Sequence, residues 1–131
     1  MISDGSFKDE YGTACCVIEG ETPRGRIFGS CITLGNAKDQ SAYRSELAGL
    51  YGIITMLEAI CQYHAVTAGN AEIGCDGMQA LRYGTTDTDI TSPKYLDYDL
   101  ISAIRAAMHR CLSSGQPGMS KVIRMMRQML F

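Results

Sequence analysis

The stretch AYRSELAGLYGII, residues 42–54, begins the longest run of helical periodicity in this chain of 131 residues. Between residues 40 and 63, apolar side chains recur at spacings of three and four: Tyr43, Leu47, Leu50, Ile54, Leu57 and Cys61. That spacing predicts one long helix with a single apolar stripe. Asp39 or Ser41 can cap its first backbone amides, so we expect the helix to begin beside them.

Short β segments precede this helix. Residues 1–7, 12–20 and 25–35 have strand-like composition and are separated by short polar turns, which predicts an antiparallel meander. After the helix, AEIGCDG (71–77) is a short buried-looking strand. Three antiparallel strands followed by a crossover helix and a fourth, parallel strand define an α/β fold with a mixed sheet and helices packed on its faces.

Further helices are expected after the fourth strand. Residues 78–83 favour a short helical piece, residues 84–94 are a polar loop, and residues 95–112 have the spacing of a second long helix. We expect residues 1–112 to form one domain, residues 113–131 to be an irregular tail, and a fifth strand to be missing.

Bulk composition excludes some classes of protein. Hydrophobic residues make up 46% of the chain and charged residues 20%, as in an ordinary globular domain. No apolar run is long enough to span a membrane, so we expect an intracellular protein, cytoplasmic or nuclear, with no membrane partner. The six cysteines contain no CxxC pair, so we expect reduced thiols without disulfide partners. A formal net charge of −2 means that nucleic-acid binding would require a local basic patch or bound cations.

Three acidic residues are candidates for a metal site: Asp4, Glu46 and Asp76. Each also has an ordinary structural explanation, as a turn residue, a solvated helical side chain and a helix cap. However, Glu46 lies about 60° from the centre of the apolar stripe, at roughly 100° per residue. If the fourth strand lies parallel beside the first, Asp4 and Asp76 come from neighbouring strands. Three acids at one edge repel each other unless a cation neutralises them, and oxygen ligands suit Mg2+, with Mn2+ as a substitute.

Three motifs, SDGSF, AYRSELAGLYGII and IGCDGMQAL, give the chain a resemblance to a known family. In this order they are similar to the type 1 ribonuclease H domain carried by retroelement reverse transcriptases, and the resemblance covers about residues 2–108. It implies an endonuclease that hydrolyses the RNA strand of RNA–DNA hybrids with two Mg2+ ions, in a monomeric domain that was once part of a larger polyprotein. Asp4 would bridge both ions, and Glu46 and Asp76 would hold the ion at the leaving oxygen.

Substrate contacts can be suggested on the same basis. Gly5 and Ser6 follow the first ligand, where backbone amides could approach a hybrid. Four arginines are candidate phosphate contacts, although a solvated surface is the more common explanation for any single one: Arg24, Arg26, Arg44 and Arg82.

The chain departs from the family at its end. A fourth carboxylate normally follows the last core strand, in a motif like HVKGHQDD that this sequence lacks. Methionine has one codon, ATG, so the reading frame one base earlier through Met125 and Met126 contains GAT, which encodes aspartate. The codons of residues 119–126 permit the whole missing motif in that frame. We therefore expect the tail to be out of frame, the domain to be truncated at both ends, and catalysis to be impaired.

Two other readings stay open. The chain could be a non-catalytic nucleic-acid-binding module, or a retroelement relic without function. A basic amphipathic helix in residues 118–131 that seeks a membrane surface is a further alternative for the tail.

Overall fold

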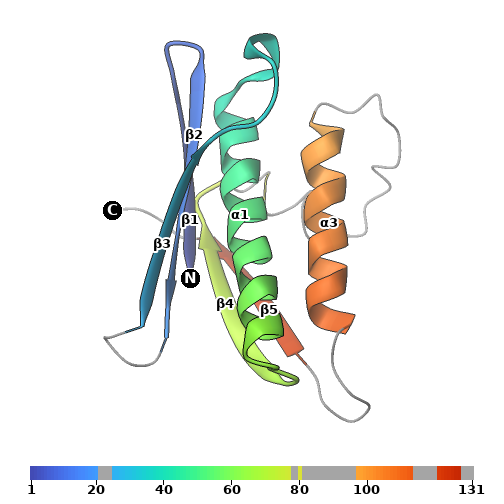
Figure 1. Cartoon of the computed structure of the whole chain (residues 1–131). Coiled ribbons are helices and arrows are strands. Elements are labelled where there is room, and N and C mark those ends of the chain that lie inside the picture. The colour runs from blue at the N-terminus through green and yellow to red at the C-terminus, as the bar shows by residue number, and fades with distance from the viewer. Residues whose placement is uncertain (21–24, 78–79, 81–96, 114–120, 128–131) are drawn as a thin grey trace.

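A mixed sheet forms the framework of the molecule, for which we describe a computed structural model (Figure 1). The structure describes residues 1–20, 25–77, 80, 97–113 and 121–127. Its strands are β1 (Ile2–Lys8), β2 (Tyr11–Glu19), β3 (Arg26–Ile32), β4 (Gly69–Cys75) and β5 (Lys121–Arg127). Its helices are the 3-10 turn η1 (Ala37–Asp39), α1 (Ala42–Tyr63) and α3 (Tyr98–Ser113).

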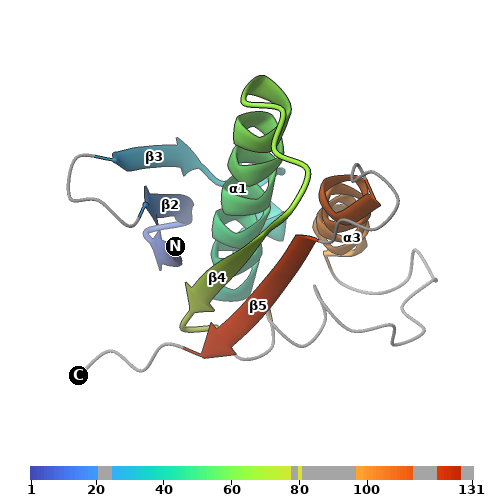
Figure 2. The same cartoon turned by 90° about the horizontal axis from the view of Figure 1, so that it is seen from below.

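The strand order in the sheet is β3-β2-β1-β4-β5. β1 pairs antiparallel with β2, and β2 pairs antiparallel with β3, whereas β1–β4 and β4–β5 are parallel. The expected meander, crossover helix and parallel fourth strand are therefore confirmed. Both helices lie on one face of the sheet, with α1 against β1 and β2 and with α3 beside α1 (Figures 1 and 2).

The long helix begins where its capping chemistry predicts. The hydroxyl of Ser41 accepts a hydrogen bond from the amide of Arg44 at 2.9 Å, so Ser41 rather than Asp39 caps α1. The apolar stripe faces the sheet and α3, and its centre is fully buried. The core lies between the helices and the sheet and includes Ala14, Cys16, Leu47, Leu50, Ile54, Ile73, Leu100 and Ile104.

The expectation of a missing fifth strand and a wholly irregular tail is wrong. Residues 121–127 form β5, which pairs in parallel register with the whole of β4, from Gly69↔Lys121 to Cys75↔Arg127. Without a neighbour, the outer edge of β4 would present a row of unpaired backbone groups, and pairing satisfies them. The β-branched Val122 and Ile123 favour the extended conformation. Ile123 is half-buried against the core, whereas Val122 is exposed. Because side chains alternate along a strand, Val122 belongs to the opposite face of the sheet.

Two sequence expectations about the chain's environment can be compared with the structure. The six cysteines all lie in the described part of the chain, and none of them forms a disulfide. Within the described residues, no helix is long and apolar enough to cross a membrane. The short helix expected at 78–83, of which only residue 80 is described, and the loop at 84–94 lie outside the described part of the chain.

Candidate active site

The first strand packs on the long helix backbone to backbone. A Cβ built on Gly5 would lie 2.3 Å from the carbonyl carbon of Ser45 and 2.4 Å from the amide nitrogen of Glu46. A Cβ on Gly49, one turn further along α1, would lie 3.0 Å from the carbonyl oxygen of Asp4. Both glycines therefore allow an approach that a larger residue would prevent, and this approach brings Asp4 beside Glu46.

The parallel pairing of β1 and β4 brings in the third acid. Ser3 is in register with Cys75, so Asp4 and Asp76 are the next residues along two neighbouring strands. Asp76 directly follows the end of β4 and is exposed. A Cβ on Gly77 would meet the Cβ and Cγ of Glu46 at 3.1 Å, so the chain that leaves β4 passes close beside the Glu46 side chain.

The electrostatics of Glu46 reflect this convergence. Burial raises the pKa of the half-buried Glu46 carboxyl, and the negative charges of Asp4 and, more weakly, Asp76 raise the same pKa further. The Cys75 thiol donates to Glu46 Oε2 at 3.7 Å and partly offsets that rise in pKa. On β2, burial and then the charges of Asp4 and Glu46 raise the pKa of the Cys15 thiol, which lies opposite Asp4. The charges of Asp4 and Asp76 therefore both act on the Glu46 carboxyl.

This donor set fits a hard divalent cation. Glu46 is a half-buried carboxyl with a raised pKa, and two further acids lie next to it. A bound cation would offset the repulsion among the three carboxylates. The donors are oxygens, as Mg2+ prefers, and within the described ranges no group of three His, Cys, Asp or Glu side chains is already arranged to hold a metal ion. Asp4, Glu46 and Asp76 are thus neighbours at one edge of the sheet rather than a closed ligand shell.

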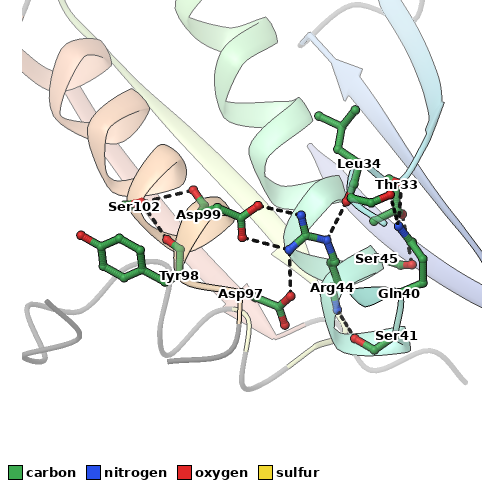
Figure 3. Close-up of polar contacts among 11 residues, drawn as sticks. Thr33, Leu34, Gln40, Ser41, Arg44, Ser45, Asp97, Tyr98, Asp99 and Ser102 are labelled. Atoms are coloured by element: carbon green, nitrogen blue, oxygen red, sulfur yellow. Dashed lines mark hydrogen bonds and ion pairs between the residues drawn. The ribbon is translucent and has the colours of Figure 1, made fainter. Parts of the chain in front are cut away.

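Arg44 does not fit the role of a phosphate contact. Its side chain is only 5% exposed, and its guanidinium donates to Asp97 Oδ1 at 2.8 Å and to Asp99 Oδ2 at 2.7 Å (Figure 3). Its Nε donates to the Leu34 carbonyl at 2.6 Å. Hydrogen bonds to Asp99 and Asp97 raise the pKa of Arg44, so it stays charged. The arginine instead ties the start of α1 to the start of α3 and to the segment after β3.

The remaining candidate contacts have different positions. Gly5 donates its amide to the Asp4 carboxylate at 2.9 Å and packs on α1, so its observed role is local. Ser6 is exposed on β1, and Arg26 is exposed on β3, where it forms an ion pair with Glu19 of β2. Arg24 and Arg82 lie outside the described residues.

The partnership of Arg44 with Asp97 and Asp99 could not be found by sequence reasoning. The pairs are separated by 53 and 55 residues, and no local spacing connects them. One signal in the sequence could have suggested acidic partners for Arg44. Arg44 is on the buried side of the predicted helix, where the neighbouring side chains are apolar. A buried arginine requires acidic partners.

Comparison of the chain with models of known protein families finds no match, and comparison with curated proteins finds no similar sequence.

Proposed function

We propose that this chain is a ribonuclease H-like domain of retroelement origin that acts on RNA–DNA hybrids inside the cell. The observation that carries the proposal is the convergence of Asp4, Glu46 and Asp76 from β1, α1 and the end of β4. The mixed sheet with its parallel β1–β4 pair and crossover helix supports the proposal, because that topology brings the three acids to one edge. The three quoted sequence motifs contain the same three acids.

The chemistry of the proposed site follows from its donors. Asp4, Glu46 and Asp76 would hold Mg2+, or Mn2+ in its place, and a bound divalent ion supplies Lewis-acid stabilisation of charge at a phosphate. Until a cation binds, the residues of this chain repel a polyanion at this edge. The exposed Ser6 and Arg26 are the described candidates for orienting the nucleic-acid backbone, by a hydroxyl donor and a positive charge respectively.

Catalysis by the chain in this form is proposed to be weak. The sequence contains no Asp or Glu after Asp99, so nothing in it corresponds to the fourth carboxylate that the family resemblance implies after the last strand. Asp97 and Asp99 are bound to Arg44 and do not supply it. We therefore expect divalent-dependent hybrid binding with cleavage near background.

The test measures hybrid binding and cleavage by the full chain with Mg2+, with Mn2+ and with chelator. We expect affinity for the hybrid to rise with the divalent ion and to lose that dependence in Asp4→Asn and Asp76→Asn. Glu72→Gln is the matched control, because Glu72 is an exposed acid on β4 away from the site. Binding that needs no divalent ion and is unchanged in Asp4→Asn would overturn the proposal in favour of a non-catalytic binding module. Robust Mg2+-dependent cleavage abolished by Asp4→Asn would overturn only the expected impairment.

A further inference from the structure

A concave site lies between α1 and the hairpin of β2 and β3, and its lining does not include Asp4, Glu46 or Asp76. It is an apolar cavity of about 200 Å³. Small residues on both sides create the space, including Gly29 on β3 and Gly49 and Gly52 on α1. The proposed nuclease site makes no use of this cavity.

Sulfur-containing residues from three elements line this cavity: Cys15 and Cys16 of β2, Cys31 of β3 and Met56 of α1. The Cys16 thiol of β2 donates to the Met56 thioether of α1, with 3.2 Å between the two sulfurs. Cys31 of β3 also lines it. Cys16 is in register with Gly29 and Ala14 with Cys31, so Cys16 and Cys31 are diagonal neighbours on the face of the sheet that α1 covers.

The two sulfurs approach the sheet closely because residue 29 is glycine. A Cβ built on Gly29 would lie 3.3 Å from Met56 Sδ and 3.5 Å from Cys16 Sγ. Both sulfurs therefore lie against the position where any other residue would place its Cβ. Cys31 is exposed, lines the same cavity and is on the same face of the sheet as Gly29.

We propose that Cys16, Cys31 and Met56 form a binding site for one soft monovalent metal ion, of which Cu(I) is the biological example. Thiolate and thioether ligands select soft ions, and a set of three sulfurs satisfies the low coordination number of Cu(I). Structural zinc takes four ligands, and the described lining offers neither a histidine nor a carboxylate to complete such a set. The remaining cysteine of the lining, Cys15, alternates with Cys16 along β2, so its side chain belongs to the other face of the sheet. The apolar walls favour an ion that is weakly hydrated. On binding, the two thiols release their protons to solvent, and no electron is transferred.

The experiment titrates the reduced full chain with Cu(I) under anaerobic conditions, against a coloured Cu(I) chelator of known affinity. We expect one tight equivalent in the wild type. Because loss of even an outer-shell partner costs about 10-fold in metal affinity, Cys16→Ser, Cys31→Ser and Met56→Leu should each weaken that equivalent by about 10-fold or more. Gly29→Val should weaken it similarly by filling the space. Cys61→Ser is the control, because Cys61 is a half-buried thiol on α1 outside this cavity.

Circular dichroism of each variant separates loss of a ligand from loss of the fold. Cys31 is exposed, so Cys31→Ser tests the site even if a core variant such as Cys16→Ser fails to fold. A tight equivalent that survives in folded Cys31→Ser and Met56→Leu would overturn the proposal. Equal loss in Cys61→Ser would also overturn it, because binding would then be a general property of the thiols. Hybrid binding by the carboxylate site plays no part in either outcome.

Discussion

Gly5 of β1 and Ser45 of α1 lie so close that a Cβ at residue 5 would be 2.3 Å from the Ser45 carbonyl carbon. Because the neighbouring atoms belong to the backbone of a long helix, they cannot turn aside as a flexible side chain could. Asp4 directly precedes Gly5, and Glu46 directly follows Ser45. The contact therefore fixes both acids at the same edge of the sheet. The candidate site therefore depends on a glycine that is not itself a ligand.

Gly5→Ala should destabilise the protein, since either β1 or α1 must shift to admit the methyl group. Overpacking of this kind costs about 1–3 kcal/mol in the free energy of unfolding. Gly52→Ala is the matched control: nothing lies within 4 Å of its Cβ position, and Ala is favoured over Gly inside a helix by about 1 kcal/mol. Urea denaturation of both variants checks the prediction. Equal stability of the two variants would show that the close packing of β1 on α1 is absent in solution.

Arg44→Met should be among the most damaging single changes. It leaves the buried Asp97 carboxylate, which is 2% exposed, without its cation, and breaking a buried pair in this way costs about 3–5 kcal/mol. Arg26→Gln is the control, since Arg26 and Glu19 form a surface pair worth about 0–1 kcal/mol. The denaturation midpoints of Arg44→Met and Arg26→Gln test this prediction. Similar midpoints for the two variants would mean that Arg44 is a surface residue after all, and it would again be a candidate phosphate contact.

The same network predicts an acid dependence of stability. Hydrogen bonding to Arg44 lowers the pKa of Asp99 in the folded protein, so the folded state binds this proton less tightly than the unfolded state does. The stabilisation is therefore present above the ordinary aspartate pKa and disappears as the pH falls through the lowered one. Asp99→Asn should be less stable than the wild type at pH 7, with a gap that closes in strong acid. The gap should be small because Asp99 is 66% exposed. Urea midpoints between pH 7 and pH 2 measure it, and a gap that stayed constant over this range would refute the mechanism.

Glu46→Gln should change the stability at pH 7 in the opposite direction to Asp99→Asn, by making the protein more stable. Burial, then Asp4 and more weakly Asp76, raise the pKa of Glu46, so the folded state favours its protonated form. The wild type is then most stable, with respect to this group, below the ordinary glutamate pKa, and it loses stability as the pH rises through the raised one. Without divalent ions, Glu46→Gln should melt at a higher temperature than the wild type at pH 7, and the advantage should vanish in acid. A Glu46→Gln variant that is less stable at pH 7 would mean that the three acids do not repel each other.

Substitutions in β5 test whether the last strand forms as described. Ile123 packs against the core and pairs with Ala71, whereas Val122 is 40% exposed on the other face of the sheet. Ile123→Ala should therefore cost more free energy of unfolding than Val122→Ala, by about 1–2 kcal/mol for the additional apolar surface removed. Thermal melts of the two variants provide the comparison. Equal and negligible effects of the two substitutions on stability would show that residues 121–127 form an irregular tail, as the sequence suggested.

Much of the fold could be predicted because it follows from periodicity. The spacing of Leu47, Leu50 and Ile54 predicted the buried face of α1, and the switch from strand-like to helical spacing predicted the order of elements. The last strand was missed because KVIRMMR, residues 121–127, combines β-branched residues with Met, Lys and Arg, which favour helices. Its conformation is decided by the free edge of β4, a tertiary contact that no local pattern contains. The out-of-frame origin of the tail stays a prediction that only the nucleotide sequence can test.

The candidate site was partly predictable for a similar reason. The sequence could predict the proximity of Asp4, Glu46 and Asp76, because Asp4 and Asp76 belong to neighbouring parallel strands and Glu46 borders the buried face of the helix. The close approach that Gly5 and Gly49 permit could not be predicted, since it depends on how α1 sits on β1. Arg44 was misassigned because a long basic side chain is normally exposed, and its partners Asp97 and Asp99 come from a distant part of the chain.

The most direct test of the carboxylate site is paramagnetic broadening by Mn2+ in a spectrum of the nitrogen-15-labelled full chain. Substoichiometric Mn2+ should first remove the amide signals of Gly5, Leu47 and Gly77, which adjoin the three acids, and Asp4→Asn should abolish this selectivity. Broadening centred on other acids, such as Glu72 or Asp99, or spread evenly over the surface, would contradict the claim that Asp4, Glu46 and Asp76 form one cation site.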